Sequence, residues 1–390
     1  MAKRPNGKEA TMALDLTLLR SEFPVTAEWA YLNHAAIGPF SRGTTAAVEA
    51  VVRGFSSPEA MDRDARASAP DIAREHVAAL VGGSSERVAF VGSLADAISL
   101  ATAGIDWQPG DNILIPREEF PSNVYPVLNL ERRGVGVRYV EKDEGGFTSV
   151  DKIAAAIDGR TRALVISHVE FMTGYRNDLS AIGSLCRERD VLSIVDGTQS
   201  IGPMPLSVDN DGIDVIAAHC YKWLMAAFGL GVMHFSERAI ERIHPTYAGR
   251  LSVNSGFENL DYALDWRPGA QRYQTGGLNW ITLTAFNASA ELIRSLDSHE
   301  IEQHLLRLTD RLLSEVSAMG YRVTSDLDPA HRSQICSFTS GAAEQDAALV
   351  ERMTSNHVAV SLRGKGIRVS PYFYNNDGDI DRLLELLPHL

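Results

Sequence analysis

The sequence is poor in cysteine and in long apolar runs, and each shortage excludes a class of protein. Its 390 residues include three cysteines, Cys186, Cys220 and Cys336, too few and too scattered for a disulfide framework or a paired-cysteine metal site. We therefore expect a reducing, cytoplasmic location. No apolar run reaches membrane-spanning length, and residues 1–15 lack the apolar core of an export signal, so we expect no membrane partner.

Basic charge is also scarce. The chain has 37 lysines and arginines against 50 acidic residues, and its net charge of −13 argues against a nucleic-acid partner. The hydrophobic content of 45% is enough for substantial cores. At roughly 150 residues per domain, the length predicts two domains. Small molecules are the expected ligands.

Short apolar runs alternate with helical patterns up to about residue 280, which predicts βαβ units and an α/β fold with a mainly parallel sheet. The predicted strands are Arg87–Val91, Asn112–Ile115, Arg162–Ile166, Val191–Val195 and Asp214–Ala218. Longer amphipathic helices follow. We expect a disordered tail (1–15), an N-terminal segment that packs with the small domain (16–30), a large domain (31–283) and a small C-terminal α+β domain (284–390).

Two polar side chains follow neighbouring apolar runs. Asp196 ends the run to Val195, and Lys222 lies just after the run that ends at Ala218. Ligands of open α/β sheets bind beyond the carboxyl ends of the strands, so both residues are expected at one edge of the sheet. A lysine and a carboxylate placed in this way suit pyridoxal 5'-phosphate, in which the lysine binds the cofactor covalently and the aspartate keeps the pyridine nitrogen protonated. A structural ion pair is the alternative.

A phosphate group needs its own binding site, and the Gly92 turn offers one. It joins a predicted strand to a helix that opens with Ser93 and Asp96 at capping-box spacing. Free amides and the helix dipole at such an N-terminus attract an anion. An ordinary capped helix explains the same pattern.

Other motifs have the wrong spacing. His299 and His304 lie five positions apart, so they diverge where a zinc helix would align its ligands, and we expect no metal site. The glycines around Ser200 do not form a hydrolase elbow, and those around Leu230 do not form a dinucleotide loop.

Taken in order, seven stretches resemble the class V aminotransferase family, the pyridoxal phosphate enzymes of fold type I. They are Tyr31–Gly38, Ser93–Ile98, Glu119–Pro126, Val195–Ser200, Tyr221–Leu224, Gln274–Asn279 and Ile367–Pro371. The resemblance covers nearly the whole chain. It implies a large domain with a mainly parallel, seven-stranded sheet and a smaller C-terminal domain.

The resemblance also implies which residues bind the cofactor ring. Lys222 is similar to the lysine that binds it covalently, and Asp196 to the partner of the pyridine nitrogen. Gln199 resembles the residue that hydrogen-bonds the phenolic oxygen, and Phe120 occupies the position of the ring that stacks on the pyridine.

Phosphate contacts follow from the same resemblance. The backbone amides of Leu94 and Ala95 and the side chains of His219 and Tyr221 are the implied ligands. A second loop, Thr275, Gly276 and Gly277, resembles the loop that reaches the phosphate across a dimer interface. The resemblance therefore implies a homodimer with shared active sites.

On the substrate side, Arg368 matches the arginine that binds the substrate carboxylate, a role suited to its forked guanidinium; the alternative is a surface arginine on a strand. Arg250 and Arg363 are candidates for a second substrate anion or are solvent-facing. Asn33 and His34 lie in a motif that approaches the substrate in the family, and a structural histidine is the alternative.

The sequence leaves the reaction open. Elimination or side-chain cleavage of an amino acid is our first interpretation, because desulfurases, lyases and kynureninases belong to this family. Epimerisation or transamination is the alternative, and a cofactor-binding module without turnover is a third. Phe171, after Glu170, stands where desulfurases usually have an asparagine. The segment Ser355–Gly366 contains no cysteine, which argues against a persulfide relay.

Overall fold

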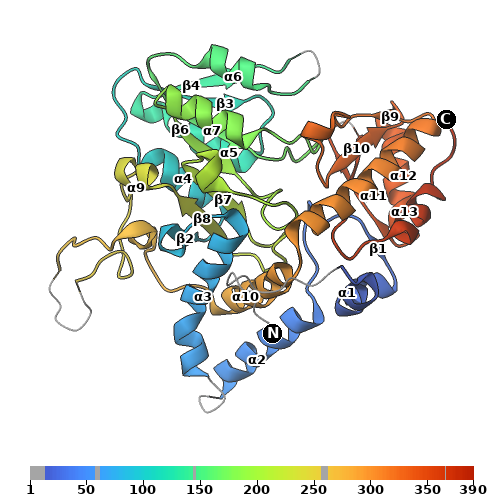
Figure 1. Ribbon diagram of the computed structural model, residues 1–390, viewed down its shortest axis with the longest axis horizontal. Helices are drawn as coiled ribbons and strands as arrows, with labels where there is room; N and C mark the ends of the chain where they lie inside the picture. Colours follow the sequence, from blue (N-terminus) through green and yellow to red (C-terminus); the bar gives the residue numbers. More distant parts are fainter. Residues whose placement is uncertain (1–13, 58–61, 144–145, 256–261, 365) are drawn as a thin grey trace, which may run out of the picture.

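The computed structural model describes residues 14–57, 62–143, 146–255, 262–364 and 366–390 (Figure 1). The predicted tail, residues 1–15, lies almost wholly outside them. Within the described residues, no helix combines the length and the apolar character needed to cross a membrane.

A seven-stranded sheet forms the centre of the larger part of the molecule. Its strands are β2 (Val88–Val91), β3 (Asn112–Pro116), β4 (Gly136–Val140), β5 (Thr161–Ser167), β6 (Leu192–Asp196), β7 (Val215–His219) and β8 (Gly231–Phe235). Their order is β2-β8-β7-β6-β5-β3-β4. All neighbours are parallel except β8, which runs antiparallel to β2 and β7. The predicted mainly parallel α/β fold is confirmed, and β4 and β8 add two strands that the sequence analysis did not identify.

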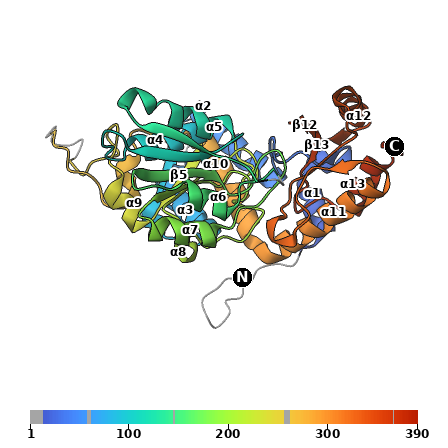
Figure 2. The same cartoon turned by 90° about the horizontal axis from the view of Figure 1, so that it is seen from above.

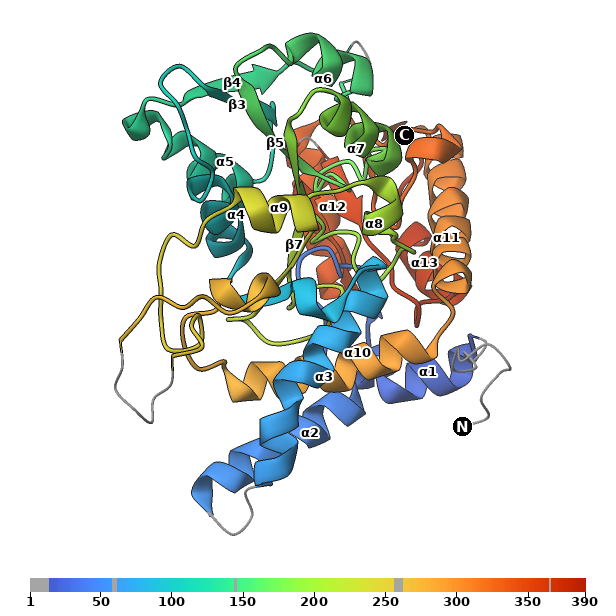
Figure 3. The ribbon, with the colours of Figure 1, turned by 60° about the vertical axis from the view of Figure 1, so that its left-hand side comes forward.

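Helices cover both faces of this sheet, which explains why its strands are apolar on both sides (Figure 3). One face packs against α4 (Leu94–Ala103), α5 (Pro121–Leu128) and α9 (Glu237–Arg242). The other packs against α3 (Arg63–Val81), α7 (Leu179–Glu188) and α10 (Trp280–Ser295). The remaining helices of this part are α2 (Arg42–Ser56), α6 (Val150–Ala156) and α8 (Val208–Asp211).

The C-terminal part has its own sheet and core, beside the seven-stranded part (Figure 2). Its antiparallel sheet has the order β12-β13-β10-β9. The elements are α11 (Ser298–Ala318), β9 (Arg322–Val323), β10 (Cys336–Thr339), α12 (Ala343–Ser355), β11 (Val358–Ala359), β12 (Ser361–Arg363), β13 (Gly366–Val369) and α13 (Asp377–Leu384). The division into two domains stays a prediction. We propose the junction of α10 and α11 as the boundary, because α10 packs on α2 and α3 whereas α11 packs on β9, β10 and α13.

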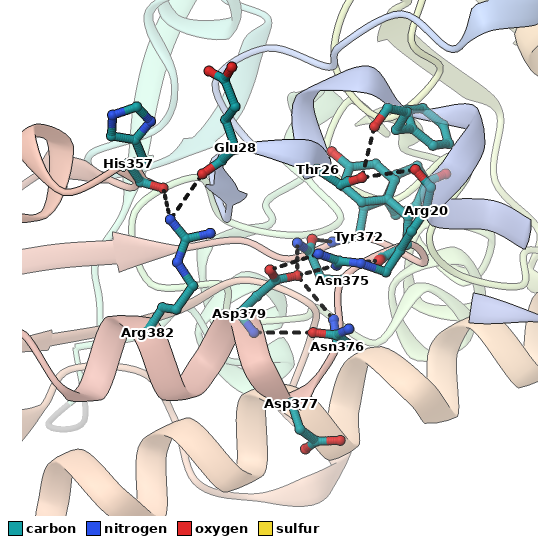
Figure 4. Close-up of polar contacts among 12 residues, drawn as sticks. Arg20, Thr26, Glu28, His357, Tyr372, Asn375, Asn376, Asp377, Asp379 and Arg382 are labelled. Carbon is teal, nitrogen blue, oxygen red and sulfur yellow. Dashed lines mark hydrogen bonds and ion pairs between the residues drawn. The ribbon is translucent and has the colours of Figure 1, made fainter. Parts of the chain in front are cut away.

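The N-terminal segment, α1 (Leu16–Glu22) and β1 (Ala30–Tyr31), lies against the C-terminal part. β1 pairs in parallel with β11. Arg20 on α1 donates to the Oδ2 atom of Asp379 at 2.6 Å and to the backbone carbonyl of Tyr374 at 3.0 Å (Figure 4). Asp379 is buried and also accepts a hydrogen bond from the side chain of Asn375 at 2.9 Å. An ion pair with a buried carboxylate thus joins the N-terminal segment to the C-terminal part.

Candidate active site

Two strand ends bring Asp196 and Lys222 together. Asp196 is the last residue of β6, and β7 pairs with β6 in parallel and ends at His219, three positions before Lys222. Both side chains are about 95% buried, with relative exposures of 5%. The structure therefore places both residues at one edge of the sheet, where the sequence placed them.

Lys222 lies in an environment that favours the neutral amine. Burial lowers its pKa to about 8; Asp196 opposes this shift, and the positive charge of Arg368 adds to it. The Nζ atom lies 5.2 Å from the ring centroid of Phe120 and 5.9 Å from that of Tyr221. A buried lysine with a lowered pKa presents a larger fraction of neutral, nucleophilic amine near neutral pH than an ordinary lysine does.

Asp196 is held by a hydrogen bond to each of its carboxylate oxygens. Oδ1 accepts from the backbone amide of Thr198 at 2.8 Å, and Oδ2 accepts from the side-chain amide of Asn123 at 3.1 Å. Asn123 also donates to Glu119 at 3.0 Å. The hydrogen bond between Asn123 and Asp196 links α5 to β6 across the sheet edge and fixes the orientation of the Asp196 carboxylate.

Glu119 organises the same region from the other side. Desolvation raises the pKa of this partly buried carboxyl group. It accepts hydrogen bonds from the backbone amide of Ser167 at 2.6 Å, from the Ser167 hydroxyl at 2.8 Å and from the backbone amide of Phe120 at 2.9 Å. The sequence analysis quoted this stretch but assigned a role to Phe120 alone. One sequence feature could have indicated that Glu119 and Asn123 contact each other: they lie four positions apart, on either side of Phe120.

Phe120 provides an aromatic wall beside the lysine. It is the N-cap residue of α5, and Pro121 follows it at the first helical position. Proline suits that position because a backbone N–H there would have no partner within the helix. Its ring meets that of Phe171 edge to face, with centroids 5.2 Å apart. Phe171 thus supports the wall and supplies no side-chain hydrogen bond.

The predicted phosphate turn begins α4. The Ser93 hydroxyl accepts from the backbone amide of Asp96 at 3.2 Å and donates to its carboxylate at 2.9 Å, so Asp96 is turned toward the cap. The Leu94 amide faces Nδ1 of His219 at 3.4 Å, and burial lowers the pKa of His219 to about 4. The Leu94 and Ala95 amides belong to the first turn of a ten-residue helix, where backbone donors lack helical partners.

Gln199 is fixed by two contacts in the core of the site. Its Oε1 accepts from the Trp223 indole at 2.6 Å, and its Nε2 donates to the backbone carbonyl of Ala35 at 3.2 Å. One N–H of the amide remains for the predicted cofactor contact.

Arg368 carries an unsatisfied positive charge in the same region. It is 2% exposed; its Nη1 donates to the Phe171 carbonyl at 2.7 Å, while Nε and Nη2 are buried without a partner. Burial, together with the positive charge of Arg363, lowers its pKa to about 9. A buried cation with two free donors is costly unless an anion binds it.

The sequence profile of the Aminotransferase class-V family matches residues 49–383. The chain belongs to the class V aminotransferase family. Among curated relatives, the "Probable cysteine desulfurase" of Methanothermobacter thermautotrophicus is 28% identical over 82% of this chain and 82% of that protein. A "Cysteine desulfurase" of Salmonella gallinarum is 26% identical over 77% of each.

Solved structures share the fold of this class V aminotransferase. The cysteine desulfurase CsdA of Escherichia coli aligns with a TM-score of 0.83 at 20% identity, covering 96% of this chain and 98% of that one. The "cystine C-S lyase C-DES", solved with cysteine persulfide, aligns with a TM-score of 0.85 at 20% identity, covering 93% and 98%. The predicted family and fold type are therefore confirmed, as is pyridoxal phosphate, the cofactor of this family.

The residues present fit that cofactor. A buried amine, a hydrogen-bonded carboxylate, an aromatic ring and a helix N-terminus surround one region, and Arg368 adds two free donors. These are the groups that a phosphorylated pyridine aldehyde and an amino acid require. Their individual roles stay predictions.

His34 and Asn33 approach this region from the N-terminal segment. His34 is fully buried, stacks on Trp223 with ring centroids 5.3 Å apart, and contacts the Tyr374 hydroxyl at 2.7 Å. Burial lowers its pKa to about 3, so the imidazole is neutral. Asn33 forms a β-bridge with Ser370, and its Oδ1 is buried without a partner.

Another group of predicted residues comprises Arg250 and the loop Thr275–Gly277. Gly276 and Gly277 are exposed, and Arg250 and Gly277 line a cleft whose lining includes none of Lys222, Asp196 and Arg368. In the described part of the chain, no hydrogen bond, ion pair or ring contact joins these residues or Thr275 to Lys222 or Arg368. The contact of Thr275, Gly276 and Gly277 with the phosphate of a second subunit stays a prediction, as does the contact of Arg250 with a substrate anion.

Proposed function

We propose that this class V aminotransferase removes the Cα proton of an α-amino acid bound to pyridoxal phosphate and then cleaves a C–S bond in its side chain. The observation that carries the proposal is Arg368, a buried guanidinium with two unpartnered N–H donors whose charge is felt at Lys222. Such a fork suits the carboxylate that every α-amino acid carries.

Each residue around Lys222 would contact a different part of the cofactor. Asp196 would hold the pyridine nitrogen, Phe120 would lie against the ring, and the Leu94 and Ala95 amides would receive the phosphate. Bound there, pyridoxal phosphate supplies an electron sink for the bond that breaks at Cα.

The protein's own groups perform the proton transfer. Arg368 binds the carboxylate through two parallel N–H donors and so fixes Cα relative to Lys222. The Nζ atom of Lys222, neutral above a pKa of about 8, takes the Cα proton. The sulfur substituent then leaves Cβ with the bonding electron pair.

We infer that the released sulfur is not passed to a cysteine of this chain. Cys186, Cys220 and Cys336 are all buried, and burial raises the pKa of each thiol, to about 12 for Cys186 and Cys336. A thiol is nucleophilic as its thiolate, so none of these three is suited to accept sulfur. This supports a lyase that releases its sulfur product into solution.

A homodimer is part of the proposal. Gly276 and Gly277 are exposed, and open space surrounds the position of an added Cβ at each, so the loop has room for another molecule. We propose that this loop completes the phosphate site of the partner subunit.

A panel of amino acids tests the proposal. Purified protein with pyridoxal phosphate is incubated with cystine, cysteine and their sulfur-free analogues, and pyruvate, alanine, keto acid, sulfide and loss of chirality are followed in parallel. We expect pyruvate and reduced sulfur from the sulfur amino acids. Keto acid without sulfur release would support transamination, and loss of chirality alone would support epimerisation; either result contradicts C–S cleavage.

A further inference from the structure

A turn between β5 and α7, residues 169–176, contacts Arg368 on one side and the aromatic wall on the other. The Phe171 carbonyl accepts from Nη1 of Arg368 at 2.7 Å, and the other two guanidinium nitrogens have no partner within the described residues. The Phe171 ring meets that of Phe120, whose centroid lies 5.2 Å from Nζ of Lys222. The position of this turn therefore decides where the free donors of Arg368 lie relative to Lys222.

The backbone of the 169–176 turn is closed by its own hydrogen bonds. Val169 and Arg176 form an antiparallel bridge across its base. The Glu170 amide donates to the Tyr175 carbonyl at 2.9 Å, and the Gly174 amide donates to the Glu170 carbonyl at 3.0 Å. Because these bonds tie both sides of the turn together, a shift at residue 174 is passed to the carbonyl of residue 171.

Two serines of the C-terminal part hold this turn, which follows a strand of the seven-stranded sheet and reaches toward the C-terminal part (Figure 1). The Ser333 hydroxyl donates to the Gly174 carbonyl at 2.6 Å, and the Ser325 hydroxyl donates to the Thr173 carbonyl at 2.5 Å. Ser333 is 1% exposed. A buried carbonyl that loses its donor pays a desolvation penalty, so the contact with Ser333 resists displacement of the turn.

Gly174 permits the close approach of the turn to the C-terminal part. Its φ is +75°, and an added Cβ would lie 2.0 Å from the Ile335 carbonyl oxygen. Ile335 directly precedes β10, and β10 pairs with β13, where Ser337 lies opposite Arg368. The contacts therefore form a closed circuit that runs from Arg368 to the turn, from the turn to β10, and from β10 back to β13.

We propose that Ser333 and Gly174 are positioning residues for the substrate carboxylate. They hold the turn against β10, which keeps the Phe171 carbonyl on Nη1 of Arg368 and leaves Nε and Nη2 free for the carboxylate. A guanidinium held at one nitrogen offers its remaining donors in a fixed geometry. The inference rests on the role of Arg368 in the proposed function, and it adds how the C-terminal part fixes that side chain.

Calorimetric titration of the holoenzyme with propionate tests the proposal. Propionate carries a carboxylate on a chain as long as that of cysteine and has no amine, so its binding is measured without turnover. Propionamide, its neutral counterpart, shows how much of the binding depends on the carboxylate. The test variants are Ser333→Ala, which removes the hydroxyl, and Gly174→Ala, which forces the turn away from Ile335.

A matched control is Ser236→Ala. Ser236 is also buried; its hydroxyl donates to Asp214 at 2.9 Å and accepts from the Ala239 amide at 3.0 Å. It follows β8, whose last residue, Phe235, pairs with the first residue of β7, so it lies at the opposite edge of the sheet from Lys222. The control therefore loses similar hydrogen bonds at a distance from the turn.

We expect propionate to bind the wild type more tightly than propionamide does, and Ser333→Ala to weaken propionate binding about tenfold. The KM of the sulfur amino acid should rise by a similar factor, and Gly174→Ala should have at least as large an effect. Ser236→Ala should lower the urea midpoint and leave propionate binding unchanged. Equal propionate affinity in Ser333→Ala and the wild type, or equal weakening by Ser333→Ala and Ser236→Ala, overturns the proposal.

Titration of Arg368→Met distinguishes failure of this inference from failure of the proposed function. If Arg368→Met loses propionate binding while Ser333→Ala and Gly174→Ala keep it, Arg368 binds the carboxylate and the positioning role alone is wrong. If Arg368→Met binds propionate as the wild type does, or the wild type shows no carboxylate-dependent binding, the role of Arg368 and this inference are both wrong.

Discussion

Replacing Arg368 with methionine should lower the activity without lowering the stability of the fold. The substitution removes a buried charge that has two unpartnered donors, and it leaves the Phe171 carbonyl without its donor. The lost hydrogen bond costs about 1 kcal/mol. Replacing a buried ion pair with apolar side chains of similar volume is typically neutral or stabilising by about 1–4 kcal/mol. Within the described residues no carboxylate pairs with Arg368, so the substitution leaves no buried anion without its partner. We therefore expect the free energy of unfolding of the apoenzyme to stay unchanged or to rise by about 1–2 kcal/mol.

The activity of Arg368→Met should fall. Two charge-assisted hydrogen bonds to a carboxylate, at about 1.5 kcal/mol each, correspond to roughly a hundredfold in kcat/KM. Urea unfolding gives the stability and amino-acid turnover gives the activity.

A matched control is Arg238→Met. Arg238 pairs at 2.7 Å with Asp214, which is 1% exposed, so this change leaves a buried carboxylate without its charge partner. The control should lose about 2–4 kcal/mol of stability. If Arg368→Met loses as much stability as the control, Arg368 is a structural residue and the reasoning fails.

Three further predictions follow from the same contacts. The rate at which apoenzyme binds pyridoxal phosphate should rise with pH through a midpoint of about 8, because the neutral amine of Lys222 is the nucleophile; a midpoint near the ordinary lysine value would contradict its burial. Asn123→Ala should lower kcat about tenfold and shift the absorbance of the bound cofactor, because Asp196 loses a hydrogen bond; unchanged spectra would show that the contact is unimportant. Arg20→Ala should lower the free energy of unfolding by about 2–3 kcal/mol, because Asp379 stays buried without its ion-pair partner; a urea midpoint equal to that of the wild type would refute this.

Much of the fold was predictable because the buried strands read as continuous apolar runs. Helices on both faces leave no solvent-facing side to β3, β5 or β6, so each strand is a short run of mostly apolar residues. β8 was missed although it is equally buried, because it follows β7 with no helix between them and runs antiparallel, outside the alternation of strand and helix that predicted most of the other strands.

The site was predictable where chain order alone brings residues together. Asp196 and Lys222 follow adjacent parallel strands, so their proximity is a consequence of topology. The contact of Asn123 with Asp196 depends on how α5 packs over the sheet edge. The unpartnered donors of Arg368 likewise depend on what surrounds it after folding. Tertiary packing of this kind leaves no local pattern in the sequence.

The central claim is that Lys222 is the amine that binds the cofactor in a site built for an amino acid. The most direct measurement is borohydride reduction of protein reconstituted with pyridoxal phosphate, followed by peptide mass spectrometry. The account predicts a single pyridoxyl label on Lys222, and no label at that peptide in Lys222→Ala. A stable label on another lysine, with Lys222 unmodified in the wild type, would contradict it.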